Sequence, residues 1–242
     1  MNIDQVSEQG AAVITGASSG IGLKISRMLG QMGYEVFGFG RNFREEAFWQ
    51  EKPYHAIVCD LNDTDKMCSY VKQIAAQNSV RVLVNNAGAG YYGLHEELNP
   101  KKIQEMVRTN LEAPMILTQL LLRDLKKNAG YIINIASVTA NESNPHGCAY
   151  GATKAGLASF TRSLFDEARK YGVKVSAIYP DLTKTNLYRN ADFKEGDELE
   201  SYLLPEEVAG AVEYILKQRD GVVAAEIVLK PQIHRIKRIK KK

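Results

Sequence analysis

Residues 11–22 read AAVITGASSGIG, which is a short apolar run followed directly by a glycine-rich turn. The chain continues as LKISRMLGQMG, a segment that we predict to be helical. Glycines between a strand and a helix let backbone N–H groups approach a phosphate, and the helix N-terminus adds unpaired donors and the positive end of its dipole. The stretch therefore predicts the first strand, the phosphate-binding turn and the first helix of an α/β domain.

The alternation of short β-branched runs with longer amphipathic segments continues along the chain. Strands are predicted at 11–15, 34–40, 54–59, 80–86, 131–137, 173–180 and 225–230. One helix is predicted to begin at Gly20, and a second to end at about Asn78. Two more cover 101–127 and 148–171, and the last runs from Pro205 to about Gln218. Strand followed by helix, repeated, is typical of a parallel sheet covered on both faces. We predict an α/β fold with one doubly wound, Rossmann-type domain over residues 1–234 and a basic tail at 235–242.

The composition is that of an ordinary globular protein, with 31 Lys and Arg, 28 Asp and Glu, and 45% hydrophobic residues in 242. These values exclude disordered and collagen-like chains. No apolar run reaches the roughly 18 residues that a membrane-spanning helix needs, and the opening residues MNIDQVSEQG lack the basic and apolar regions of a signal peptide. We expect a cytoplasmic protein.

Cysteine and histidine give no sign of a disulfide framework or a metal site. Cys59, Cys68 and Cys148 form an odd set without C-x-x-C spacing. The four histidines lie far apart in sequence and form no pair at helical spacing. We predict packing roles for the cysteines and no bound metal.

The basic residues are concentrated at the C-terminus, where RIKRIKKK at 235–242 holds six of the 31. The other 25 basic residues oppose 28 acidic ones, a balance of −3. A body of that charge gives no indication of a nucleic-acid or membrane partner. The tail is interpreted as a solvated terminus, with docking on an anionic surface as the alternative. We expect its deletion to leave turnover and mass in solution nearly unchanged.

The end of the second predicted strand indicates the cofactor. It reads Gly38-Phe39-Gly40-Arg41-Asn42, with Arg44 close behind and no acid that would bind ribose hydroxyls. A basic residue there suits the 2′-phosphate of NADP(H). Asp60 and Leu61 end the third strand, where they either hold an adenine edge or form a plain turn. Cofactor contacts are expected at Gly16, Ser18, Ser19, Gly20, Ile21, Gly22, Arg41, Asn42, Asp60 and Leu61.

Tyr150 and Lys154 stand four residues apart in AYGATKAGLASF, so a helix places both on one face. A fixed ammonium beside a phenol lowers the phenol pKa, and Tyr150 could then exchange a proton with a carbonyl or alcohol oxygen. Ser137 ends the fifth predicted strand, at the carboxyl edge where such sheets bind ligands. Its hydroxyl could hold the substrate oxygen.

Asn110 lies four residues before Pro114 within a predicted helix. Because proline has no N–H for the carbonyl of residue 110, the helix should kink there. The freed carbonyl could hold a water that connects Lys154 to solvent, or it could simply be solvated at a plain kink.

Taken together, TGASSGIG at 15–22, NNAG at 85–88, Asn110, Ser137 and Y-x-x-x-K at Tyr150 and Lys154 resemble the compact single-domain branch of the short-chain dehydrogenase/reductase family. The resemblance covers about residues 10–230. It implies that Asn110, Ser137, Tyr150 and Lys154 form the family's tetrad, with Lys154 also holding the nicotinamide ribose. It further implies adenosine-side contacts at Asn86, Ala87 and Gly88, and contacts beside the nicotinamide at Pro180, Thr183 and Thr185.

The chain departs from the family pattern in two places. Pro180 is followed by Asp181 where the family usually has glycine, which adds a charge near the expected nicotinamide. The last strand also lacks the common glycine-rich ending, which leaves the usual C-terminal subunit contact open.

The leading hypothesis is an NADP(H)-dependent oxidoreductase that moves a hydride between nicotinamide and a carbonyl or secondary alcohol, with reduction favoured. The alternative is a slow NADP(H)-binding sensor that reports to a partner. We expect residues 90–93, 141–147 and 181–204 to wall the substrate pocket, the last as a lid or else a mobile loop. In the family, helices like 101–127 and 148–171 face a second subunit, so a homodimer or homotetramer is expected.

Overall fold

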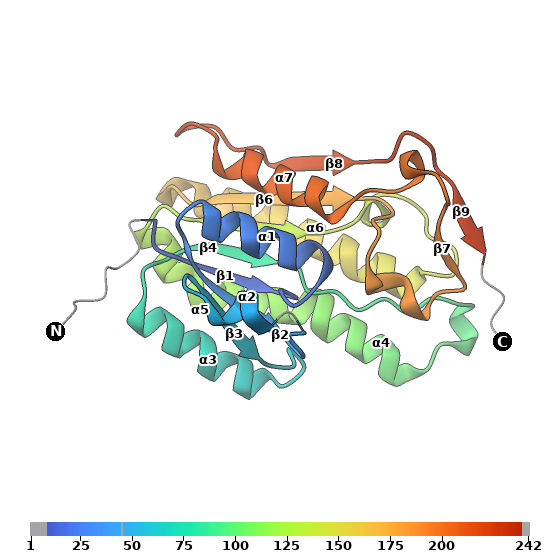
Figure 1. Cartoon of the computed structure of the whole chain (residues 1–242), viewed down its shortest axis with the longest axis horizontal. Coiled ribbons are helices and arrows are strands. Elements are labelled where there is room, and N and C mark those ends of the chain that lie inside the picture. The colour runs from blue at the N-terminus through green and yellow to red at the C-terminus, as the bar shows by residue number, and fades with distance from the viewer. Residues whose placement is uncertain (1–8, 45, 239–242) are drawn as a thin grey trace.

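Seven parallel strands form the centre of the computed structural model, which describes residues 9–44 and 46–238. Their spatial order is β3-β2-β1-β4-β5-β6-β8, and helices cover both faces (Figure 1). The strands are β1 Ala11–Thr15, β2 Glu35–Gly40, β3 Tyr54–Val58, β4 Val80–Asn85, β5 Tyr131–Ile135, β6 Lys174–Pro180 and β8 Glu226–Leu229. The predicted fold class is confirmed.

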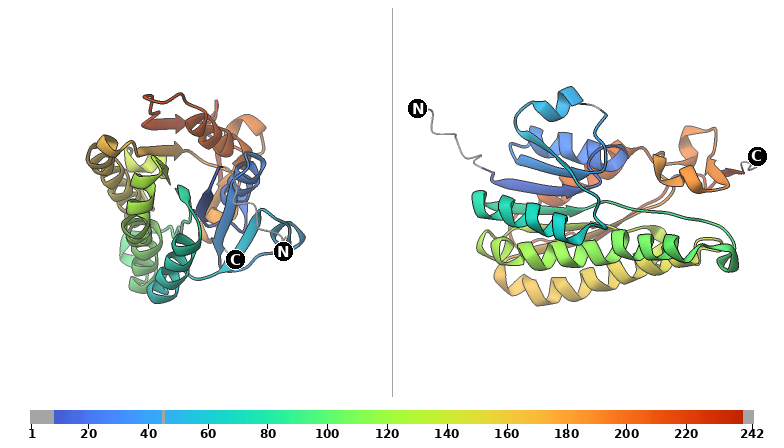
Figure 2. Two further views of the ribbon diagram at one scale, coloured as in Figure 1. Left: turned by 90° about the vertical axis from the view of Figure 1, so that its left-hand side faces the viewer. Right: turned by 90° about the horizontal axis from the view of Figure 1, so that it is seen from below.

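The helices lie in two layers, one on each side of the sheet (Figure 2). One layer holds α1 and α7, which pack on each other, and the other holds α3, α5 and α6. The helices are α1 Gly20–Gln31, α2 Glu46–Gln50, α3 Thr64–Gln77, α4 Pro100–Val107, α5 Ala113–Lys127, α6 Cys148–Ala168 and α7 Pro205–Leu216. No helix in the described ranges has both the length and the apolar character needed to cross a membrane.

Strand β1 shows why a central parallel strand of this kind is almost wholly apolar. Ala12 and Ile14 belong to the core on the α1 and α7 side, whereas Ala11 and Val13 belong to the core on the other side. Successive side chains of a strand point to opposite faces, and here both faces are buried. The continuous apolar run that predicted the fold is the direct result.

The position of the site follows from the strand order. Strand β1 pairs with β2 on one side and with β4 on the other, so the chain direction across the sheet reverses between β1 and β4. Loops that leave the carboxyl ends of such a pair move apart and open a crevice. The glycine-rich turn after β1 and the NNAG segment after β4 therefore meet at this crevice.

The predicted helix over 101–127 is interrupted at the expected place but in a particular form. Arg108–Glu112 is a turn of π-helix between α4 and α5, and the Ala113 N–H donates to the Arg108 carbonyl, five residues earlier. Pro114 follows within the first turn of α5, where its missing N–H costs least. Asn110 lies inside the widened turn and is fully buried.

The segment 181–204, called the lid segment here, contains more regular structure than its sequence predicted. It holds short 3₁₀ turns at Asn186–Asn190 and Leu199–Ser201 and a strand, β7, at Phe193–Glu195. Strand β7 pairs with β9, Ile236–Arg238, in a second sheet of two antiparallel strands. Residues 236–238 are exposed to solvent, as predicted for the tail, but they also pair with β7; the tail residues 239–242 lie outside the described residues.

Candidate active site

A cavity of about 580 Å³ opens at the carboxyl edge of the sheet. Every residue predicted to bind the cofactor lines it except Gly22. Of the predicted tetrad, Ser137, Tyr150 and Lys154 line it, and Asn110 lies behind its wall. The predicted site residues, which come from most of the length of the chain, are therefore brought together at one place.

Two glycines of the phosphate turn lie so close to other protein atoms that a side chain would not fit. Gly16 has a φ of +66°, and a Cβ there would lie 2.8 Å from the Ala87 Cα. A Cβ on Gly22 would lie 2.1 Å from the Gly16 carbonyl oxygen. Gly22 therefore does not line the cavity. Its lack of a side chain lets the first turn of α1 pack against the Gly16 carbonyl.

Helix α1 begins without the groups that usually neutralise a helix N-terminus. Its N-cap, Ser19, makes no side-chain capping hydrogen bond, and its first turn holds no acid. The first N–H groups of an α-helix have no partner within the helix, and they attract an anion together with the helix dipole. The backbone here thus suits a pyrophosphate.

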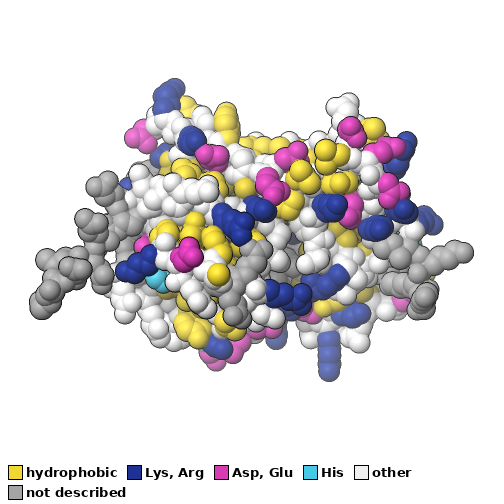
Figure 3. Space-filling model, in the orientation of Figure 1, with side chains coloured by type: hydrophobic (Ala, Val, Ile, Leu, Met, Phe, Trp, Pro, Cys, Tyr) yellow, Lys and Arg dark blue, Asp and Glu magenta, His cyan; other side chains and the backbone are white. Residues whose placement is uncertain are grey.

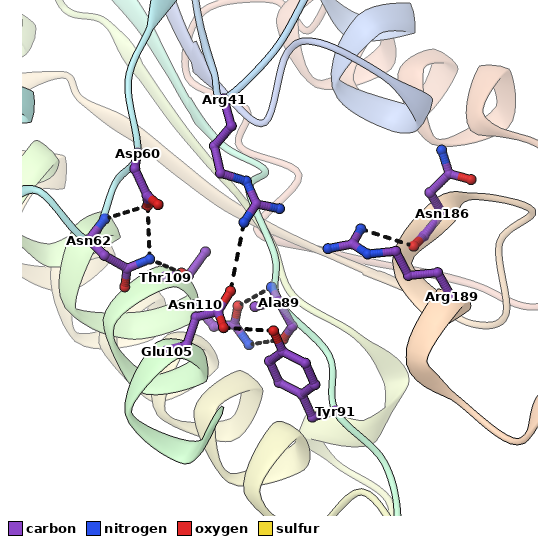
Figure 4. Close-up of polar contacts among 10 residues, drawn as sticks. All are labelled: Arg41, Asp60, Asn62, Ala89, Tyr91, Glu105, Thr109, Asn110, Asn186 and Arg189. Carbon is purple, nitrogen blue, oxygen red and sulfur yellow. Dashed lines mark hydrogen bonds and ion pairs between the residues drawn. The ribbon is translucent and has the colours of Figure 1, made fainter. Parts of the chain in front are cut away.

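The adenosine side of the cavity contains Arg41, which extends from the end of β2 toward α4 (Figure 4). Its guanidinium is exposed and lies 3.8 Å from a carboxylate oxygen of Glu105. The other Glu105 oxygen accepts a 2.6 Å hydrogen bond from the Tyr91 hydroxyl, and this bond raises the pKa of Tyr91. Glu105 is a cavity residue that the sequence analysis did not identify.

Asp60 also lies at this side, and its carboxylate organises the turn after β3. Its Oδ1 accepts hydrogen bonds from the Asn62 backbone N–H at 3.0 Å and from the Asn62 side chain at 2.9 Å. The Asn62 amide lies 3.5 Å from the Thr109 hydroxyl of the π-turn. Asn62 and Thr109 line the cavity as well, and no local pattern in the sequence singles them out.

The lid segment contributes Asn186, Leu187, Tyr188 and Arg189 to the cavity in addition to the predicted Thr183 and Thr185. In Figure 4 the Arg189 and Arg41 side chains enter the same space from different elements, with Glu105 and Tyr91 beneath. Arg189 also donates a hydrogen bond to the Asn186 carbonyl at 3.3 Å. Two guanidinium groups therefore border the cavity within reach of anionic ligands.

Tyr150 and Lys154 lie on α6, close to the end of β5 where Ser137 stands. All three side chains are buried. Tyr150 is hydrogen-bonded to Ser137, while the Lys154 ammonium donates to the Ile135 carbonyl at 2.8 Å and lies 5.9 Å from the Tyr150 ring centre. A proton-bearing phenol, a hydroxyl and an ammonium thus share one end of the cavity.

Burial dominates the protonation of this group. It raises the pKa of Tyr150 to about 12, although the hydrogen bond with Ser137 opposes the rise. It lowers the pKa of Lys154 to about 8, since a buried ammonium loses hydration. The sequence predicted that Lys154 would lower the tyrosine pKa; in this structure burial outweighs any such effect and the net pKa is raised.

The side chain of Asn110 makes hydrogen bonds within the protein and does not line the cavity. Its Oδ1 accepts from the Ala89 N–H at 2.8 Å, and its Nδ2 donates to the Ala89 carbonyl at 2.9 Å and the Thr153 hydroxyl at 3.0 Å. Thr153 in turn donates to the Tyr150 carbonyl at 2.7 Å. Asn110 therefore ties the segment after β4 to the helix that carries Tyr150.

Asp181 stands where the family usually has glycine, and its carboxylate has partners within the protein. Its N–H donates to the Leu229 carbonyl at 2.9 Å, so the backbone continues along β8. One carboxylate oxygen accepts from the Leu182 N–H at 2.7 Å, and the other lies 3.7 Å from His234 Nδ1. The backbone path after Pro180 is thus held from both sides.

The described residues contain no cluster of acids, histidines and cysteines that could hold a metal ion. Cys59, Cys68 and Cys148 are all free thiols. The groups that line the cavity near the end of β5 are the hydroxyl of Ser137, the phenol of Tyr150 and the ammonium of Lys154.

The comparisons with known proteins identify the family. The family model described as short chain dehydrogenase matches residues 10–196. The chain belongs to the short-chain dehydrogenase family. Members of this family are oxidoreductases, and the predicted resemblance is confirmed.

Two curated relatives and one solved structure illustrate the similarity. An uncharacterized oxidoreductase of Staphylococcus epidermidis is 32% identical over 225 residues, covering 91% of this chain and 96% of the relative. An acetoacetyl-CoA reductase of an Acinetobacter species is 29% identical over 237 residues, covering 91% and 96%. The structure of an alcohol dehydrogenase from the archaeon Thermococcus sibiricus, complexed with 5-hydroxy-NADP, has a TM-score of 0.82 at 29% identity and covers 93% of this chain and 97% of that one.

The shifted pKa of Lys154 predicts a pH-dependent stability. Unfolded, the amine keeps its proton to about pH 10.5, whereas folded it releases the proton near pH 8. Between these values the unfolded state binds more protons, so the free energy of unfolding should rise with pH, by about 2 kcal/mol between pH 8 and 10. The Lys154→Met variant should lack this rise. Denaturant unfolding of both proteins at several pH values measures the difference, and parallel curves would contradict the assignment.

Proposed function

We propose that the chain is an NADP(H)-dependent oxidoreductase that transfers a hydride between nicotinamide and a carbonyl or secondary alcohol, with Tyr150 as general acid and base. The observation that carries the proposal is the single cavity shared by the uncapped start of α1, the Arg41 guanidinium and the buried Ser137, Tyr150 and Lys154. Its two ends suit a pyrophosphate and a proton transfer, which are the two requirements of this reaction.

The residues present fit NADP(H). Gly16 and Gly22 allow close packing of the turn, and the start of α1 beside them has no side-chain cap, which leaves its first N–H groups available to the pyrophosphate. Arg41 would hold the 2′-phosphate, and Asp60 and Leu61 would lie beside the adenine. Lys154 would bind the nicotinamide ribose. The bound cofactor would supply or accept the hydride.

The protein residues manage the proton. The Ser137 hydroxyl would donate a hydrogen bond to the substrate oxygen, and Tyr150 would give its proton to that oxygen as it gains charge. A phenol whose pKa is raised to about 12 holds its proton at neutral pH, so Tyr150 is in the form that can donate. The Lys154 ammonium would then stabilise the phenolate. The reductase named among the relatives supports reduction as the working direction.

Replacing Tyr150 with Phe tests the mechanism. The variant should lose about 100-fold or more in turnover, because its proton donor is gone, while its NADPH affinity should change little. Reduction of a panel of carbonyls, followed by nicotinamide absorbance, measures turnover, and fluorescence titration measures binding. Tyr171→Phe, at an exposed position, is the matched control.

Turnover close to that of the unmodified protein in Tyr150→Phe would contradict the mechanism. A protein that binds NADPH but reduces no carbonyl of the panel before any substitution would instead support the sensor alternative.

The contact between Arg41 and Glu105 predicts opposite effects at the two positions. Arg41→Asp should weaken NADPH binding by about ten-fold or more, since a charge-assisted contact to the 2′-phosphate is lost, and should leave NADH binding nearly unchanged. Glu105→Gln should strengthen NADPH binding, because the carboxylate no longer competes with the phosphate for Arg41. Titration of both cofactors measures the effects.

Glu97→Gln, an exposed acid on the preceding turn, controls for charge alone. Equal responses to NADPH and NADH in every variant would show that Arg41 is only a surface charge.

A homodimer or larger assembly is also part of the proposal. The outer surface of α4 and α5 exposes Val107 and Met115, whereas the opposite side of α5 is buried on the sheet. We expect these helices to face a second copy of the chain. Introducing Val107→Glu with Met115→Glu should give monomers in light scattering, and an unchanged mass would contradict this interface. Cytoplasmic location remains a proposal that rests on the sequence.

A further inference from the structure

The end of the chain is joined to the lid segment by a backbone ladder. Strand β9 pairs antiparallel with β7, with Phe193 opposite Arg238, Lys194 opposite Lys237 and Glu195 opposite Ile236. This small sheet stands apart from the main sheet, at the end of the molecule where Figure 1 places the lid segment. Among the described residues, β9 is the only strand that pairs with β7.

Side chains reinforce the ladder. Arg235 donates to a Glu198 carboxylate oxygen at 2.8 Å, and the Lys237 ammonium contacts both oxygens of Asp197 at 2.9 and 2.8 Å. The Ile233 N–H donates to the Glu200 carbonyl at 2.9 Å. Basic and acidic side chains alternate over this end of the molecule in Figure 3. The basic tail thus meets an acidic part of the lid segment.

Asp197 has a particular role in this contact. The register places Lys194 directly opposite Lys237, and two like charges across a ladder destabilise it. The pKa of Asp197 is lowered, first by its hydrogen bond with Lys237 and in addition by the charge of Lys194. Asp197 therefore neutralises the repulsion that the pairing of β7 with β9 would otherwise create.

The inner side of the lid segment packs toward the proton donor. The Phe193 ring lies 5.2 Å from the Tyr92 ring and 5.4 Å from the Tyr188 ring, and Tyr92 lies 5.6 Å from Tyr150. Phe193 belongs to β7, the strand that β9 holds. One aromatic layer thus separates the C-terminal ladder from the catalytic phenol.

The base of the lid segment has its own attachment, which does not involve the tail. Thr183 forms a β-bridge with Leu203, and the Lys184 N–H donates to the Leu203 carbonyl at 2.8 Å. Between these fixed ends lie the residues that line the cavity. The position of the outer part of the lid segment therefore depends on β9.

We propose that the C-terminal strand fastens the lid segment over the substrate end of the site, and that Arg235 and Lys237 are positioning residues that set substrate affinity through it. Exposed ion pairs are individually weak, so the fastening can release and re-form as substrate enters and product leaves. The affinity effect rests on the proposed function, whereas the fastening itself does not.

The experiment compares two charge reversals that each break an exposed lysine–carboxylate pair. Asp197→Lys breaks the pair with Lys237 and leaves the repulsion between Lys194 and Lys237 unopposed, and the control Glu213→Lys breaks the pair of Glu213 on α7 with Lys217. Hydrogen exchange followed by mass spectrometry should show residues 186–195 exchanging about three-fold faster in Asp197→Lys and unchanged in the control. KM for the carbonyl substrate should rise by a similar factor, with kcat changed less.

Exchanging the charges of residues 197 and 237 distinguishes the loss of the ion pair from the change of charge at a single position. Lys237→Glu combined with Asp197→Lys should return both exchange and KM toward the original values. Deleting residues 235–242 should have the largest effect, in contrast to the expectation from sequence alone. Unchanged exchange in both Asp197→Lys and the deletion, or equal changes in Asp197→Lys and its control, would overturn the proposal. Because exchange needs no substrate, this result stands apart from the outcome with Tyr150→Phe.

Discussion

The structure depends on one contact at the centre of the sheet. The Thr15 hydroxyl at the end of β1 accepts hydrogen bonds from the backbone N–H groups of Asn86 and Ala87, both at 3.0 Å. The Asn86 amide returns a hydrogen bond to the Thr15 carbonyl at 2.9 Å. These bonds hold the phosphate turn against the segment after β4, and Gly16 leaves the room for it. Without them the two loops would separate, and the cavity wall that Gly16, Asn86 and Ala87 form would be disrupted.

A second hydrogen-bond network extends from that segment to α6, the helix that carries Tyr150 and Lys154. Ala89, just beyond the same segment, is held by Asn110, and Asn110 is held by Thr153 on α6. Buried polar groups are costly unless they are paired, and the Asn110 amide is paired at both ends. The orientation of Tyr150 and Lys154 is thus set relative to the phosphate turn by hydrogen bonds rather than by apolar packing alone.

The sequence predicted those features that depend on local pattern. The central strands were visible because they are buried on both faces and therefore apolar, and the phosphate turn was visible because of its glycines. Tyr150 and Lys154 were visible because a helix places positions four apart on one side.

The remaining features depend on distant contacts. Glu105 carries no sign of its contact with Arg41, and Arg235 and Lys237 pair with acids 37 and 40 positions away. The rise in the Tyr150 pKa reflects full burial, which spacing alone does not reveal. The local sequence also could not predict the form of the helix break near Pro114, because a kink and a π-turn can both accommodate a residue that has no N–H.

That π-turn sets the phase of the helix that precedes it. The turn holds one residue more than an α-helical turn, so α4 is rotated by about 100° relative to a continuous helix leading into α5. Shortening 108–112 by one residue would give a straight, regular helix, yet it would turn Glu105 away from Arg41 and Asn110 away from Ala89. The extra residue of the irregular turn therefore keeps both the Glu105 contact and the Asn110 contact in register, which a continuous helix would not do.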